Sequence, residues 1–153
     1  MNVHQPITYR AATREDGPAI RALLESCKLP LVGAEEHLDG FLVATVAERI
    51  IGCAGIEQHG DAALLRSCAV DADHRGHGVG IALTTRAIAL AKELGIRHLV
   101  LLTTTAGDFF PRFGFSRIAR AQMPASLRDS EEFRHACPAS ASVMQLVLKP
   151  PSE

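Results

Sequence analysis

The chain of 153 residues has no tryptophan, a single tyrosine and almost no net charge. Its 16 lysine and arginine residues are balanced by 17 aspartate and glutamate residues, which gives a formal net charge of -1. Proteins that hold a nucleic-acid backbone need a basic excess, and those that bind single strands also use aromatic side chains for base stacking. The composition therefore argues against nucleic acid as a partner.

Long hydrophobic runs are also missing, although 47% of the residues are hydrophobic. No apolar stretch reaches the roughly 18 residues that a membrane-spanning helix needs. The opening segment MNVHQPITYR lacks the apolar region of a secretory signal peptide. We therefore expect no membrane partner and a cytoplasmic protein. The length suits one domain, 1–153, with enough apolar residues for its own core.

The four cysteines show no C-x-x-C spacing of the kind that zinc and redox sites use. We predict that they are reduced, that most are small buried residues and that no metal is bound. Cys137 stands apart, because it lies in the Pro- and Ser-containing segment HACPASASV. A metalloid-binding role for the cysteines is the alternative.

The hydrophobic pattern predicts an α/β fold with one mixed central sheet flanked by helices. A strand at 7–12 precedes a helix that begins near Thr13 and Asp16, a pair that resembles a capping box. Three strand-like runs follow between 41 and 70 as an antiparallel meander. The other expected elements are a helical turn at 34–38, a helix that ends at Gly95, a strand at 98–103, a short helix or turn at 106–113, strands at 114–119 and 142–149, and a helix at 126–135 within the long connection 120–141.

Three glycines precede the central helix in the stretch HRGHGVGIALTTRA, residues 74–87. Glycines let successive backbone N–H groups turn toward one point, and the first turn of a helix adds unpaired donors and a positive dipole end. The loop is therefore suited to an anion. A Walker loop needs Lys followed by Ser or Thr, and a dinucleotide fold needs G-x-G-x-x-G, whose third glycine is Ile81 here. Both of those motifs are excluded.

The pattern Arg75-x-x-Gly78-x-Gly80 follows the strand-like LLRSCAV and resembles the acetyl-CoA signature Q/R-x-x-G-x-G/A of the GNAT superfamily of N-acetyltransferases. The alternative is a glycine-rich turn that only joins a strand to a helix. The resemblance implies the GNAT fold, acetyl-CoA as cofactor and, as is common in the superfamily, a homodimer. It also implies that the pantetheine arm meets backbone groups of Cys68, Ala69 and Val70, and that the pyrophosphate is wrapped by Arg75, Gly76, His77, Gly78, Val79, Gly80 and Ile81.

Longer stretches of the sequence narrow the resemblance to two subgroups of acetyltransferases. LLTTTAGDFFPRFGF is similar to part of the acetyltransferase domain of acetylglutamate synthase. GIEQHGDAALLRSCAV, LLTTTAGDFF and EFRHACPASASVM together resemble the small acetyltransferases of bacterial arsenic-resistance operons. We therefore expect an N-acetyltransferase that acts on a small-molecule amine. The alternatives are a cysteine-based metalloid-binding protein and a non-catalytic acetyl-CoA sensor.

Acetyl transfer from a thioester needs a neutral amine, a donor for the oxyanion and a proton for the departing thiolate. By the resemblance, the N–H of Val70 is the oxyanion donor. Glu57 is the candidate base, with a solvated strand-end charge as the alternative, because Leu64 stands where acetylglutamate synthases carry a glutamate. Phe110 replaces the tyrosine that many GNAT enzymes use as the acid, so a hydroxyl such as that of Thr104, or water, is expected to supply the proton.

The prediction about the substrate rests on Arg66. In the alternation Leu64, Arg66, Cys68, Val70 it is expected on the strand face that meets the acetyl-bearing arm, where a guanidinium needs an anion. We predict that Arg66 clamps a carboxylate or oxyacid of an acidic, amino-acid-like substrate. An internal salt bridge to Glu57 or Asp61 is the alternative. The other candidate substrate-binding residues are Thr103, Thr105, Cys137 and Ser140.

Overall fold

The computed structural model describes residues 6–103, 107–130 and 141–148, which form one sheet in the strand order β1-β2-β3-β4-β5-β7-β6. The strands are β1 (Thr8–Ala11), β2 (Phe41–Val46), β3 (Arg49–His59), β4 (Ala62–Val70), β5 (His98–Thr103), β6 (Ser116–Ile118) and β7 (Ser142–Val147). The helices are α1 (Gly17–Ser26) and α2 (Val79–Glu93), and the 3₁₀ turns are η1 (Arg14–Asp16), η2 (Glu35–Gly40), η3 (Ala72–His74), η4 (Phe110–Phe113), η5 (Arg120–Gln122) and η6 (Ala125–Asp129). Within these ranges, no helix has the length and apolar character to cross a bilayer.

The mixed central sheet with flanking helices agrees with the fold class predicted from the sequence. One local prediction differs. Where a helix was expected at 126–135, the described residues hold only the short turn η6, which follows Pro124 and ends as Ser130 takes an extended conformation. The rest of that predicted helix lies outside the described residues.

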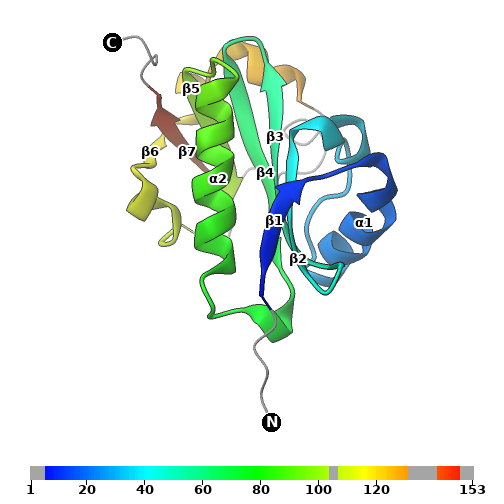
Figure 1. The fold of residues 1–153 in the computed structure, drawn as a ribbon. Helices are drawn as coiled ribbons and strands as arrows, with labels where there is room; N and C mark the ends of the chain where they lie inside the picture. The colour runs from blue at the N-terminus through cyan, green and yellow to red at the C-terminus, as the bar shows by residue number, and fades with distance from the viewer. Residues whose placement is uncertain (1–5, 104–106, 131–140, 149–153) are drawn as a thin grey trace.

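The two helices cover opposite faces of the sheet. α2 packs on strand residues that include Ala44, Ile51 and Ala54. α1 and η2 pack on others that include Val43 and Cys53. Because successive side chains of a strand point to opposite faces, β2 and β3 contribute to both cores. Figure 1 shows α2 running along the sheet, with α1 on the side of β1 and β2.

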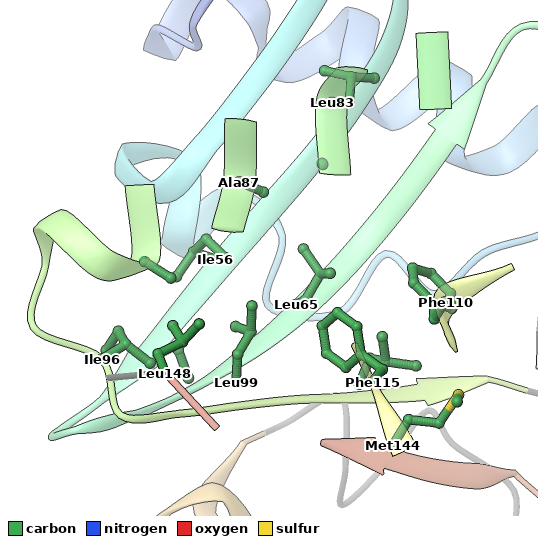
Figure 2. Close-up of a cluster of buried hydrophobic side chains, with 14 of the residues drawn as sticks. Ile56, Leu65, Leu83, Ala87, Ile96, Leu99, Phe110, Phe115, Met144 and Leu148 are labelled. Atoms are coloured by element: carbon green, nitrogen blue, oxygen red, sulfur yellow. The ribbon is translucent and has the colours of Figure 1, made fainter. Parts of the chain in front are cut away.

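The larger core lies between α2 and the sheet (Figure 2). Leu83 and Ala87 of α2 point toward Ile56, Leu65 and Leu99 on the strands, and all five side chains are at most 3% exposed. Burial of this many apolar groups is the main force that holds α2 to the sheet. The N-terminus of α2 is therefore held in place next to the end of β4.

β4 and β5 are paired over a short stretch only. The parallel pairs are Ala62 with His98, Ala63 with Leu99 and Leu64 with Val100. Beyond Leu64, β4 continues with β3 as its partner, while β5 continues beside β7. The two strands therefore part at this level, and the opening between them leads to the loop before α2.

β4 contains a bulge at Ser67. Arg66 pairs with Gly55 and Ala69 pairs with Cys53, so three residue steps in β4 match two in β3. Ser67 takes the left-handed conformation, with φ of 58°, and such a bulge interrupts the alternation of side chains. The prediction that Arg66 shares a strand face with Cys68 is therefore wrong, because it assumed an unbroken strand.

Candidate active site

A pocket of about 750 Å³ lies beside the end of β4 and the N-terminus of α2. Asp108, Phe109 and Phe110 also line it. The predicted cofactor residues line this pocket with the exception of His77, which is exposed. The structure thus brings together Cys68, Ala69, Val70, Arg75, Gly76, Gly78, Val79, Gly80 and Ile81.

The glycine loop presents backbone donors to the pocket. Gly76 and Gly78 have φ of 82° and 79°, values that favour glycine, and Gly78 is the N-cap of α2. The first hydrogen bond of the helix runs from Ala82 N–H to Gly78 C=O at 3.0 Å. The N–H groups of residues 79–81 therefore have no acceptor within the helix, and together with the helix dipole they favour an anion.

The backbone of Val70 also faces the pocket side of β4. Asp71 N–H donates to Ile51 C=O of β3 at 2.8 Å, and polar groups of neighbouring residues in an antiparallel ladder point to opposite edges. The carbonyl of Val70 accordingly accepts from Arg75 Nε at 3.1 Å instead of from β3. The N–H of Val70 points to the same edge, as the predicted oxyanion donor must.

Three free cysteines, Cys27, Cys53 and Cys68, line the same pocket. Burial, followed by the nearby thiols of Cys68 and Cys27, raises the pKa of Cys53 above its ordinary value. Its thiol therefore stays protonated and poorly reactive at neutral pH. Among the described residues, no group of three His, Cys, Asp or Glu side chains is arranged to hold a metal ion.

Glu57 and Arg66 form a buried ion pair on the face of β3 and β4 away from α2. Arg66 Nη1 donates to Glu57 Oε1 at 2.9 Å, and neither side chain is more than 1% exposed. The guanidinium also donates from Nη2 to Val32 C=O at 2.6 Å and from Nε to Ser67 Oγ at 3.1 Å. The internal salt bridge that the sequence left open as an alternative is therefore present.

Two histidines that the sequence analysis missed flank this pair. His59 Nε2 lies 2.6 Å from Glu57 Oε2, and His37 Nε2 of η2 lies 3.8 Å from Glu57 Oε1. Their side chains are 20% and 33% exposed, so they separate Glu57 from solvent. The spacing of Glu57 and His59 by two residues in a strand was the available signal. No sequence signal pointed to His37, which comes from a separate element.

The surroundings of Glu57 favour its charged form. Burial raises the pKa of this carboxyl group, but His59, Arg66 and His37 lower it by a larger amount, so that the pKa lies below the ordinary value of 4.5. A carboxylate in this state is a weak acceptor for the proton of an amine.

The lowered pKa gives a testable dependence of stability on pH. The folded state binds the Glu57 proton less tightly than the unfolded state, so the contribution of Glu57 to stability is complete above pH of about 4.5 and is lost as the pH falls through the folded-state pKa. We expect the difference in unfolding free energy between the wild type and Glu57→Gln to be largest above pH 5 and to shrink in acid. Urea unfolding at several pH values checks this, and a difference that grows in acid contradicts it.

The structure describes only some of the remaining predicted site residues. Thr103 is the last residue of β5 and pairs with Ser142 of β7. Phe110 is buried in the core and contributes to the pocket wall. Four candidates lie outside the described residues: Thr104, Thr105, Cys137 and Ser140.

The chain is similar over most of its length to known acetyltransferases. Residues 37–117 match the family described as the acetyltransferase (GNAT) domain. An amino-acid acetyltransferase of Mycobacterium tuberculosis is 30% identical over 135 residues, which cover 82% of this chain and 76% of the relative.

Solved structures show the same architecture. A Mycobacterium tuberculosis protein crystallised in complex with CoA matches with a TM-score of 0.78 at 28% identity, over 93% of this chain and 99% of that one. N-acetylglutamate synthase from Neisseria gonorrhoeae, complexed with coenzyme A and N-acetyl-glutamate, matches with a TM-score of 0.80 at 23% identity, over 96% of this chain and 36% of that one. The second likeness shows a shared fold.

Proposed function

This chain belongs to the GNAT acetyltransferase family, and on that premise we propose that it transfers the acetyl group of acetyl-CoA to the amine of a small, amino-acid-like acceptor. The observation that carries the proposal is the pocket beside β4, which the predicted cofactor motif lines. Acetyl-CoA, when bound, supplies the acetyl group as a reactive thioester. The residues present suit such a ligand, since the loop offers donors for phosphates and the pocket also reaches Cys68, Ala69 and Val70 of β4.

We propose separate roles for the two sides of the pocket. The backbone N–H groups of residues 76–81 and the Arg75 guanidinium bind the pyrophosphate. The open edge of β4, at residues 68–70, binds the pantetheine arm in place of a neighbouring strand. The Val70 N–H is the proposed donor to the developing oxyanion, where a fixed backbone dipole needs no reorganisation. Thr104 remains a candidate source of the proton for the thiolate.

The acceptor is proposed to be acidic and to bind on the face of β3 and β4 opposite α2. Arg66 and Glu57 are buried there, and His37 and His59 give the cluster its contact with solvent. We keep Arg66 as a substrate-binding candidate, although an acceptor carboxylate must share the guanidinium with Glu57. The similarity to an amino-acid acetyltransferase supports an amino-acid-like acceptor. Arsenic- or phosphorus-bearing analogues of glutamate are included in this proposal, as is a role in arsenic resistance.

Three further properties are proposed on the sequence analysis alone. They are a single catalytic domain over residues 1–153, a cytoplasmic location and a homodimer. Light scattering after gel filtration tests the last of these, and a monomer at all concentrations contradicts it.

The function is tested by the release of free CoA thiol from acetyl-CoA in the presence of a panel of amines. The panel contains L-glutamate, L-aspartate, a phosphinic analogue of glutamate, L-leucine and spermidine. We expect release that depends on the amine and is fastest with an acidic member. Acetylation of only neutral or cationic amines contradicts the acidic acceptor, and acetyl-CoA binding without amine-dependent release favours a non-catalytic sensor.

A further inference from the structure

Glu57 is badly placed to take a proton from a substrate directly. Its Oε1 accepts from Arg66 Nη1 at 2.9 Å, and its Oε2 lies 2.6 Å from His59 Nε2. The side chain is 1% exposed. Both oxygens thus have partners on the protein, and an approaching amine meets the histidines before it meets the carboxylate.

The contact with Glu57 determines which nitrogen of His59 carries a proton. An ionised carboxylate can only accept hydrogen bonds, and the low pKa of Glu57 keeps it ionised at neutral pH. Nε2 of His59 must therefore be the donor. In the neutral imidazole, Nδ1 then carries a lone pair and is free to accept a proton. No described residue forms a hydrogen bond with that Nδ1, and the side chain is 20% exposed.

The cluster also lies near the inner end of the opening between β4 and β5. Glu57 stands directly opposite Leu64, and Leu64 with Val100 is the last pair before the two strands part. The glycine loop lies at the other, wide end, so the arm of a ligand held by its phosphates points toward this level of the sheet. Arg66 links the two regions, because it contacts both Glu57 and Ser67 of the bulge.

We propose that His59 is the group that removes the proton from the acceptor amine and that Glu57 is the positioning residue that fixes its tautomer. This proposal rests on the proposed function and names the base of that reaction. The ammonium form of the acceptor loses its proton to Nδ1, so that the N–H bond breaks and an Nδ1–H bond forms. The nitrogen lone pair becomes available for acyl transfer, and the imidazolium returns the proton to solvent. Among the described residues, the charged or titratable groups that contact this pair are Arg66 and His37.

The kinetic test compares His59→Gln with His37→Gln. With the best acceptor of the panel, we expect His59→Gln to lower kcat by about 10²- to 10⁴-fold, the usual effect of a lost general base. The variant should also abolish the acid limb of the kcat/KM profile, which is the fall in kcat/KM that protonation of the base causes as the pH is lowered. His37→Gln should retain that acid limb. Calorimetry should show the same acetyl-CoA affinity in all three proteins. An acid limb that persists in His59→Gln, or that disappears only in His37→Gln, overturns the proposal.

A second measurement is independent of turnover. Nitrogen-15 NMR of the histidine side chains, assigned by the loss of one signal set in His59→Gln, should show the Nε2-protonated tautomer for His59 at pH 8, and Glu57→Gln should allow both tautomers. An Nδ1-protonated His59 in the wild type overturns the proposal even if the enzyme is active. If the tautomer is as expected but the wild type acetylates no amine of the panel, the proposed function fails, and the catalytic role of His59 fails with it.

Discussion

Replacing Gly80 by valine is expected to weaken acetyl-CoA binding about ten- to hundredfold while α2 remains folded. A Cβ added at Gly80 would lie 3.7 Å from Phe109 Cζ and 3.8 Å from Val70 Cγ2, which are ordinary contacts. The two methyl groups of valine extend beyond that Cβ, and because Gly80 lines the pocket, we expect them to take up space that the cofactor would use. Overpacking of this kind costs about 1–3 kcal/mol, and each 1.4 kcal/mol of binding energy is about tenfold in affinity.

Calorimetric titration with acetyl-CoA measures this effect, and Ala89→Val is the matched control. Ala89 is an exposed residue of the same helix and does not line the pocket. The control should bind acetyl-CoA as the wild type does, and circular dichroism should show the same helix content in both variants. An unchanged affinity for acetyl-CoA in a folded Gly80→Val protein would show that the cofactor does not bind in this pocket.

Arg66→Ala is expected to lower the free energy of unfolding by about 3–5 kcal/mol, the usual cost of removing one partner of a buried ion pair. The loss leaves the Glu57 carboxylate buried without its guanidinium and removes the donors to Val32 and Ser67. The same variant should raise the KM for the acidic acceptor. Urea unfolding at pH 7 and steady-state kinetics with the best acceptor of the panel measure the two effects.

Arg49→Ala provides the comparison for a surface ion pair. Arg49 Nη2 lies 3.6 Å from Asp71 Oδ2, and the arginine side chain is 67% exposed. Its loss should cost at most about 1 kcal/mol. Equal stability losses in the Arg49 and Arg66 variants would mean that the Glu57–Arg66 pair contributes little to the fold. A normal KM in Arg66→Ala would mean that Arg66 acts on structure and has no part in acceptor binding.

The residues that line the pocket beside α2 were predictable from sequence because most of them come from a contiguous motif. The spacing of Arg75, Gly78 and Gly80 is readable in one segment. The structure gives a reason for glycine at position 78, which has a positive φ, and it places Gly80 at the border of the pocket. A short motif of this kind predicts the local structure well, because the strand, loop and helix that it describes are neighbours in the chain.

The cluster of Glu57, Arg66, His37 and His59 depends on features that no local sequence pattern shows. The bulge at Ser67 places a serine in the left-handed region, and strand alternation gives no warning of it. As a result, Arg66 faces Glu57 on the α1 side of the sheet, while Cys68 lines the pocket beside α2. His37 reaches the same carboxylate from η2, 20 positions earlier in the sequence. Contacts between separate elements decide such a cluster, and hydrophobic periodicity does not encode them.

The most direct test is the structure of the protein in complex with CoA. We expect the pyrophosphate to lie against the backbone N–H groups of residues 76–81 at the start of α2, and the pantetheine arm to run along the open edge of β4 within hydrogen-bonding distance of Val70. The thiol end should point toward the level of Leu64 and Glu57. CoA bound elsewhere on the protein, or bound with its pyrophosphate away from the glycine loop, would contradict the proposed cofactor site.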